Sequence, residues 1–117
     1  MNYDNFFFPA DDLAATKRFY QETLGLPVKF DFSDRGMLAF QVGNEEAAII
    51  LKDKQKFHQA VPALWLEVDD VRALYQQLRA KGVRFLSEPF RIQTGWAVEC
   101  TDPSGNIVGF TDYQDKA

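Results

Sequence analysis

Residues 63–82, ALWLEVDDVRALYQQLRAKG, carry the clearest strand and helix pattern in the chain. Apolar and other side chains alternate from Ala63 to Val68, which is typical of a strand with two different faces. Asp69 and Asp70 then supply helix-capping side chains. Apolar residues recur behind them at i, i+3, i+4 and i+7, namely Val71, Leu74, Tyr75 and Leu78, and this spacing predicts an amphipathic helix. Gly82 is well placed to end that helix.

The residues after Gly82 predict three further strands, over 83–86, 96–101 and 107–111. The last two strands are separated by Asp102-Pro103-Ser104-Gly105-Asn106, a run of turn-forming residues that predicts a hairpin loop. The second half of the chain therefore has the order strand, helix, three strands.

The first half repeats this order. An aromatic run at 5–8 predicts a strand, and Asp11 or Asp12 caps a helix that is expected to run to about Glu22 and to end at Gly25. Strands follow at 28–32, 37–42 and 47–51, with Gly43-Asn44 as the turn between the last two. A polar segment over 53–61 is the expected linker, so we expect module one at about 3–52 and module two at about 62–113 within one domain.

The composition is that of a globular protein, with 46% hydrophobic and 26% charged residues. A net charge of −4 makes nucleic acid an unlikely partner. The single Cys100 excludes an internal disulfide and any zinc site built from several cysteines. No apolar run is long enough to cross a bilayer and no export signal is visible, so the expectation is a soluble cytoplasmic protein that does not act at membranes.

Several short motifs, in this order and spacing, resemble the vicinal oxygen chelate superfamily of glyoxalases, bleomycin-resistance proteins and dioxygenases. The resemblance implies an α+β fold of two βαβββ modules, whose curled mixed sheets surround a cleft, usually in a homodimer. The motifs are Asp12-Leu13, Phe19-Tyr20, Leu24-Gly25, Leu66 to Val71, Lys81-Gly82-Val83 and, above all, Thr101 to Asn106.

The resemblance also locates the family's metal ligands, which are typically His or Gln, Glu, His and Glu on the cleft face. The corresponding positions here are Asn5, Ile50, Ala63 and Gly109. Only Asn5 offers a donor atom, its amide oxygen, and that is a weak ligand. The resemblance therefore implies a member that has lost its metal site, with no cofactor.

Strand alternation extends these four positions to a predicted cleft lining, because side chains two residues apart share a face. The lining is expected to be aromatic and aliphatic with two carboxylates. Its further members are Phe7, Ala48, Trp65, Glu67 and Ile107 by alternation, and Leu38, Phe40, Ala97 and Glu99 by pairing across the two hairpins.

Trp65 and Phe40 could stack on a flat ligand, although large aromatic residues in strands are also ordinary core. Glu99, in the middle of a strand, suits a general base, an anchor for a cation, or a salt bridge to a nearby Lys or Arg.

Three functions stay open. The first is a metal-independent protein that binds a hydrophobic or aromatic small molecule, with a cationic compound as one form of it. The second is a metal-free isomerase, lyase or hydrolase that uses Glu99 as its base. The third is a structural or regulatory dimer.

Overall fold

A computed structural model describes residues 1–115 of the chain. The chain divides into two compact units. The N-terminal unit is Asn5–Pro62, and the C-terminal unit combines Met1–Asp4 with the chain from Ala63 onward. The superfamily fold is thus present as two similar units of helix and sheet, and the duplication seen in the sequence is confirmed.

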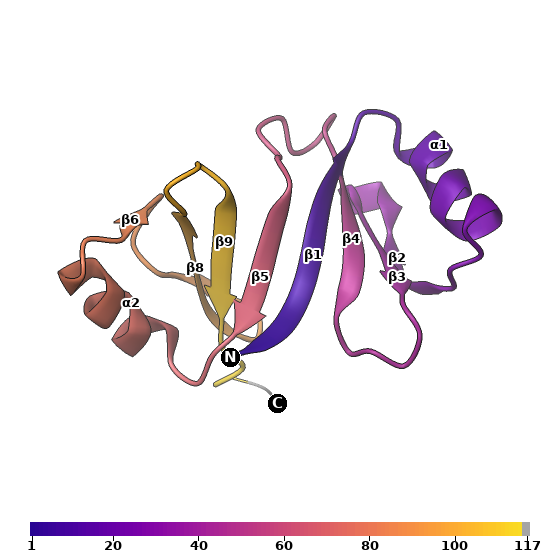
Figure 1. The fold of residues 1–117 in the computed structure, drawn as a ribbon. Coiled ribbons are helices and arrows are strands. Elements are labelled where there is room, and N and C mark those ends of the chain that lie inside the picture. Colours follow the sequence, from indigo (N-terminus) through magenta and orange to yellow (C-terminus); the bar gives the residue numbers. More distant parts are fainter. Residues whose placement is uncertain (116–117) are drawn as a thin grey trace. The chain divides into compact units, whose positions relative to one another are not determined.

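The N-terminal unit is a four-stranded sheet with helical turns against one face (Figure 1). Its strand order is β2-β3-β4-β1, in which β1 and β4 run parallel and the other neighbours run antiparallel. The elements, in chain order, are β1 (Asn2–Ala10), α1 (Leu13–Arg18), η1 (Phe19–Thr23), β2 (Val28–Phe32), η2 (Ser33–Arg35), β3 (Met37–Gln41) and β4 (Ala48–Asp53).

The first helix begins as expected but does not stay α-helical. Asp12 caps it, because its side chain accepts a hydrogen bond from the Ala15 backbone N–H at 3.0 Å. From Phe19 the chain takes π-helical turns, and the Leu24 N–H bonds the Phe19 carbonyl at 2.9 Å. Gly25 then adopts a positive φ of 75°, which explains why a glycine ends the helix.

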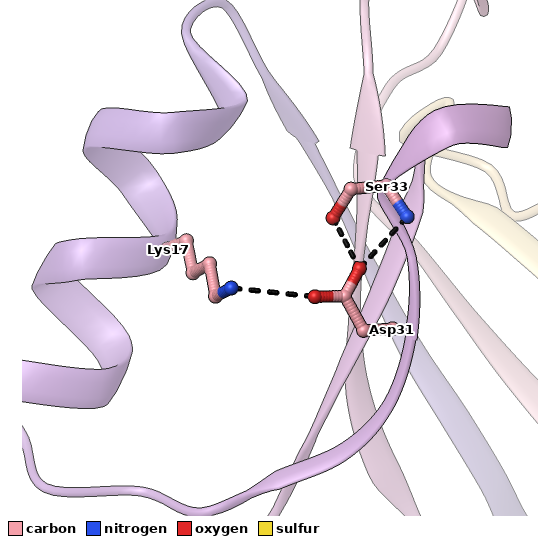
Figure 2. Close-up of polar contacts among 3 residues, drawn as sticks. All are labelled: Lys17, Asp31 and Ser33. Carbon is pink, nitrogen blue, oxygen red and sulfur yellow. Dashed lines mark hydrogen bonds and ion pairs between the residues drawn. The ribbon is translucent and has the colours of Figure 1, made fainter.

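Lys17 and Asp31 tie α1 to β2 (Figure 2). Lys17 Nζ lies 3.3 Å from Asp31 Oδ2, and the Ser33 backbone N–H donates to Asp31 Oδ1 at 2.9 Å. The Ser33 hydroxyl donates to the same Asp31 oxygen. These bonds, led by the one from the hydroxyl, lower the pKa of Asp31, with a further contribution from the Lys17 charge.

The C-terminal unit repeats this architecture with one strand more. Its order is β5-β9-β8-β6, with β7 also paired to β8 and with β5 parallel to β9. The helix α2 lies along one face of this sheet (Figure 1). The elements are β5 (Ala63–Glu67), α2 (Val71–Ala80), β6 (Arg84–Phe85), β7 (Phe90–Ile92), β8 (Gly95–Thr101) and β9 (Ile107–Thr111).

The core of each unit lies between its helix and its sheet. In the C-terminal unit, Val71 and Tyr75 of α2 pack on Val98, Cys100 and Phe110. In the N-terminal unit, Leu38, Phe40 and Leu51 pack against residues that include Leu13 and Tyr20. The faces that point away from α1 and α2 are therefore not used by these two cores, and each is called here the helix-free face of its unit.

Three details differ from the sequence prediction. Strand β7 was missed, because three residues are too few to give a periodic signal. Residues 53–61, expected to be a linker, belong to the N-terminal unit, where Asp53 N–H bonds the Gly36 carbonyl at 2.8 Å. The first strand is longer than predicted, and its start belongs to the C-terminal unit, where the Tyr113 hydroxyl donates to Asp4.

None of the helices in the described part of the chain has the length and apolar character needed to span a bilayer.

Candidate ligand-binding face

The predicted site residues of the C-terminal unit share its helix-free face. The sheet register places Trp65 and Glu99 on either side of Gly109, and residues in register point to the same side of a sheet. The same register joins Ala63 with Ile107, and Glu67 with Thr111 and Ala97. The register therefore places Ala63, Trp65, Glu67, Glu99 and Gly109 on one face, as strand alternation predicts, and their role in binding stays a prediction.

Trp65 and Glu99 are directly bonded on this face. The indole Nε1–H donates to Glu99 Oε2 at 2.9 Å, and both side chains are half-buried. The salt-bridge alternative for Glu99 is not what is seen, since no ion pair of Glu99 occurs within residues 1–115.

Gly109 provides the floor on which this pair is built. The indole ring lies against the glycine so closely that a Cβ there would overlap ring atoms Cδ1, Nε1 and Cε2 of Trp65. A glycine inside a strand often marks such a close approach. The sequence therefore carried a signal for this contact, although Gly109 had been interpreted only as a lost metal ligand.

The predicted residues of the N-terminal unit do not all share a face. Asn5 pairs with Ala48, and Phe7 with Ile50, so these four point to the helix-free side. On β3, however, the residue opposite Ile50 is Ala39.

The assignment of Leu38 and Phe40 to the site was therefore wrong. They pair with Leu51 and Ile49 and are fully buried on the helix side. The cause is an assumed hairpin register that is one residue out, because such a shift moves every side chain of a strand to the other face.

Two polar groups on the helix-free face of the N-terminal unit are already engaged. Asn5 Oδ1 accepts the Ala48 backbone N–H at 3.1 Å. The Lys52 ammonium lies 4.8 Å from the ring centroid of Phe7 and 5.3 Å from that of Phe57, both within cation–π range. The Lys52 side chain therefore partly covers Phe7, one of the predicted site residues of this unit.

The four positions of the family's metal ligands do not fit a metal ion. Ile50 and Ala63 have no donor atom, Gly109 lies under the Trp65 ring, and the Asn5 oxygen is used by the backbone. Within residues 1–115, no three His, Cys, Asp or Glu side chains come together in a way that could hold an ion. This donor set supports no step that depends on a bound metal.

Two hollows in the C-terminal unit lie away from Trp65 and Glu99. One, of about 370 Å³, opens at the start of α2 and includes Glu67 in its lining. The other, of about 560 Å³, lies between the end of α2 and the 102–106 loop and is lined in part by Cys100.

A buried carboxylate that was not predicted from the sequence links two elements of this unit. Asp112 is fully buried, and its two oxygens accept the backbone N–H groups of Val71 at 2.8 Å and Trp96 at 2.9 Å. It thereby joins the first residue of α2 to β8, the strand that carries Glu99. No periodic pattern in the sequence points to Asp112, because it follows the predicted end of a strand.

Two units of a helix on a sheet, in which the family's four ligand positions do not form a set of metal donors, define a paired βαβββ protein of the glyoxalase type. The chain matches the family model described as Glyoxalase/Bleomycin resistance protein/Dioxygenase superfamily over residues 3–110. It belongs to that superfamily.

Its relatives are distant. An uncharacterized protein, YetH, from Bacillus subtilis is 23% identical over 103 residues, covering 83% of this chain and 86% of YetH. The structure resembles methylmalonyl-CoA epimerase from Mycobacterium tuberculosis, with a TM-score of 0.73 at 22% identity over 95% of this chain and 87% of that one. A superfamily member from Vibrio splendidus 12B01 gives 0.72 at 17% identity, over 92% and 95%. At these identities the likeness shows the fold alone.

Proposed function

We propose that this chain is a metal-independent small-molecule binding protein, and that the helix-free face of its C-terminal unit recognises a hydrophobic or aromatic compound through Trp65 and Glu99. The bond from Trp65 Nε1 to Glu99 Oε2, made over the Gly109 floor, carries this proposal. It joins a large aromatic surface to a carboxylate within one half-buried patch.

The chemistry of the pair defines the compound. A flat ring would stack on the side of the indole that faces away from Gly109. Its contacts would replace contacts that the indole makes in the absence of a ligand. A positive group on that ring would approach the Glu99 carboxylate, which still has acceptor capacity beside its bond to the indole. A cation over an indole contributes roughly 0.5 to 2 kcal/mol, and a charge-assisted hydrogen bond roughly 1.5 to 3.

The test uses benzamidine, a flat cation, and benzamide, a neutral ring of similar shape. The chain has two tryptophans, so a ¹H–¹⁵N spectrum has two indole N–H signals, which Trp65→Phe assigns. Benzamidine is expected to move the Trp65 signal in a saturable way and to leave the Trp96 signal in place, because Trp96 lies on the helix side.

Glu99→Gln should weaken benzamidine binding about tenfold or more, because it removes the charge while keeping an acceptor for the indole. It should leave benzamide binding nearly unchanged, and Glu88→Gln, in an exposed loop, should change neither. Equal losses for both compounds in Glu99→Gln would show that charge is not recognised. Binding that moves only the Trp96 signal would remove the proposed face altogether.

A metal-free enzyme with Glu99 as base stays distinguishable from a binding protein. An enzyme would turn over a substrate, and Glu99→Gln would abolish that turnover while leaving the affinity for the substrate unchanged. The homodimer implied by the superfamily also remains a proposal.

A further inference from the structure

Gly109 occupies the middle of β9, between Trp65 on β5 and Glu99 on β8. Its backbone is not the reason for a glycine there, because it is absent from the glycines with positive φ. Strand interiors normally disfavour glycine, which has no side chain to pack and loses more entropy on folding. The reason for the glycine must therefore lie in its neighbours.

The neighbour that requires a glycine is the Trp65 ring. A Cβ at position 109 would lie 2.7 Å from Cε2 and closer still to Cδ1 and Nε1 of the indole. These atoms belong to a rigid bicyclic ring, so the ring can avoid a methyl group only by rotating as a whole. The overlap includes Nε1, the atom that donates to Glu99.

We infer that Gly109 is a positioning residue for the ligand-binding face: it sets the plane of the Trp65 indole and, through the Nε1–Oε2 bond, the direction of the Glu99 carboxylate. Its role in ligand selection rests on the proposed function, whereas its role in placing the two side chains does not. A side chain at position 109 displaces the indole, breaks the bond to Glu99 and leaves the carboxylate without the donor that orients it.

The first experiment needs no ligand. Gly109→Ala should shift the Trp65 indole N–H signal upfield, as expected when a hydrogen bond to a carboxylate is lost, and should leave the Trp96 signal in place. Gly105→Ala is the matched control. Its glycine has a positive φ of 86° and open space around its Cβ position, so the substitution should cost stability without moving the Trp65 signal.

A double-mutant cycle separates positioning from a general loss of stability. Gly109→Ala should raise the unfolding equilibrium constant about tenfold or more in the natural chain, as overpacking commonly does. In a Trp65→Ala background the same substitution should change it less than about threefold, because the ring it collides with is gone. Should Gly109→Ala fail to fold, Gly109→Ser in the Trp65→Ala chain still shows whether the position tolerates a side chain once the ring is removed.

The second experiment adds benzamidine. Gly109→Ala should weaken it about as much as Glu99→Gln does, and should weaken it little further in a Glu99→Gln background. If no probe binds, the proposed function fails while the ligand-free experiments still decide the role of Gly109. The inference is overturned if Gly109→Ala leaves the Trp65 signal unmoved, or if its effect on unfolding is the same with and without the Trp65 ring.

Discussion

Replacing Asp112 should destabilise the chain more than replacing any exposed helix cap. Its side chain is fully buried, and each of its oxygens accepts one backbone N–H, from Val71 at the start of α2 and from Trp96 on β8. Hydrogen bonds to a charged group contribute about 1.5 to 3 kcal/mol each. Asp112→Ala removes both of these bonds and leaves two N–H groups without their partner. It should therefore lower the free energy of unfolding by about 3 to 6 kcal/mol.

Asp112→Asn is the gentler test of the same reasoning. The amide keeps one acceptor oxygen but turns an NH₂ group toward the other N–H, so we expect the free energy of unfolding to fall by about 1.5 to 3 kcal/mol, the contribution of one bond. Asp70→Ala is the matched control, since Asp70 caps the same helix from an exposed position by accepting the Ala73 N–H at 3.0 Å. Loss of such a cap costs about 1 kcal/mol.

Urea unfolding followed by far-ultraviolet circular dichroism measures all three variants. With the urea dependence usual for small proteins, about 1 to 3 kcal/mol per molar, a loss of about 1.5 to 3 kcal/mol in Asp112→Asn should lower the unfolding midpoint by roughly 0.5 to 3 M. A midpoint within experimental error of the natural chain, or a larger effect for Asp70→Ala, would refute the assignment of Asp112 as the main link between α2 and β8.

Three further predictions concern other parts of the chain. Burial raises the pKa of the Cys100 thiol, with smaller contributions from Asp102 and Glu99, so the folded chain should react with a disulfide reagent at least about a hundredfold more slowly than the urea-unfolded chain; similar rates would contradict this. Since the pKa of Asp31 is lowered on folding, its stabilising effect is present at neutral pH and is lost as pH falls through the folded pKa; Ser33→Ala should raise that pKa, as a carbon-detected carboxyl titration would show. Elemental analysis should find no stoichiometric zinc, nickel, iron or manganese, and about one ion per chain would show that the donor set has been misjudged.

The sequence was sufficient for the overall fold because local signals agreed with each other. The Asp12 and Asp70 caps and the helix-ending Gly25 and Gly82 all appear where predicted. Each depends on side chain or backbone chemistry within a few residues, which a sequence displays directly. The repeat of these signals then predicted the duplication.

The site was predicted less completely, because it depends on register between strands. In the C-terminal unit the assumed pairing of β8 with β9 was right, so Glu99 and Gly109 were correctly placed on the same face as Trp65. In the N-terminal unit the assumed pairing was one residue out, and Leu38 and Phe40 lie on the helix side. Long-range bonds such as those of Asp112 also leave no periodic trace in the sequence.

A benzamidine titration of the ¹⁵N-labelled chain, carried out with and without excess EDTA, tests whether the Trp65–Glu99 face binds a flat cation without a metal. We expect a saturable shift of the Trp65 indole signal with the same dissociation constant in both conditions, and a Trp96 signal that does not move. Loss of the shift in EDTA would mean that binding depends on a metal, and an unmoved Trp65 signal in both conditions would mean that the Trp65–Glu99 face does not bind this class of compound.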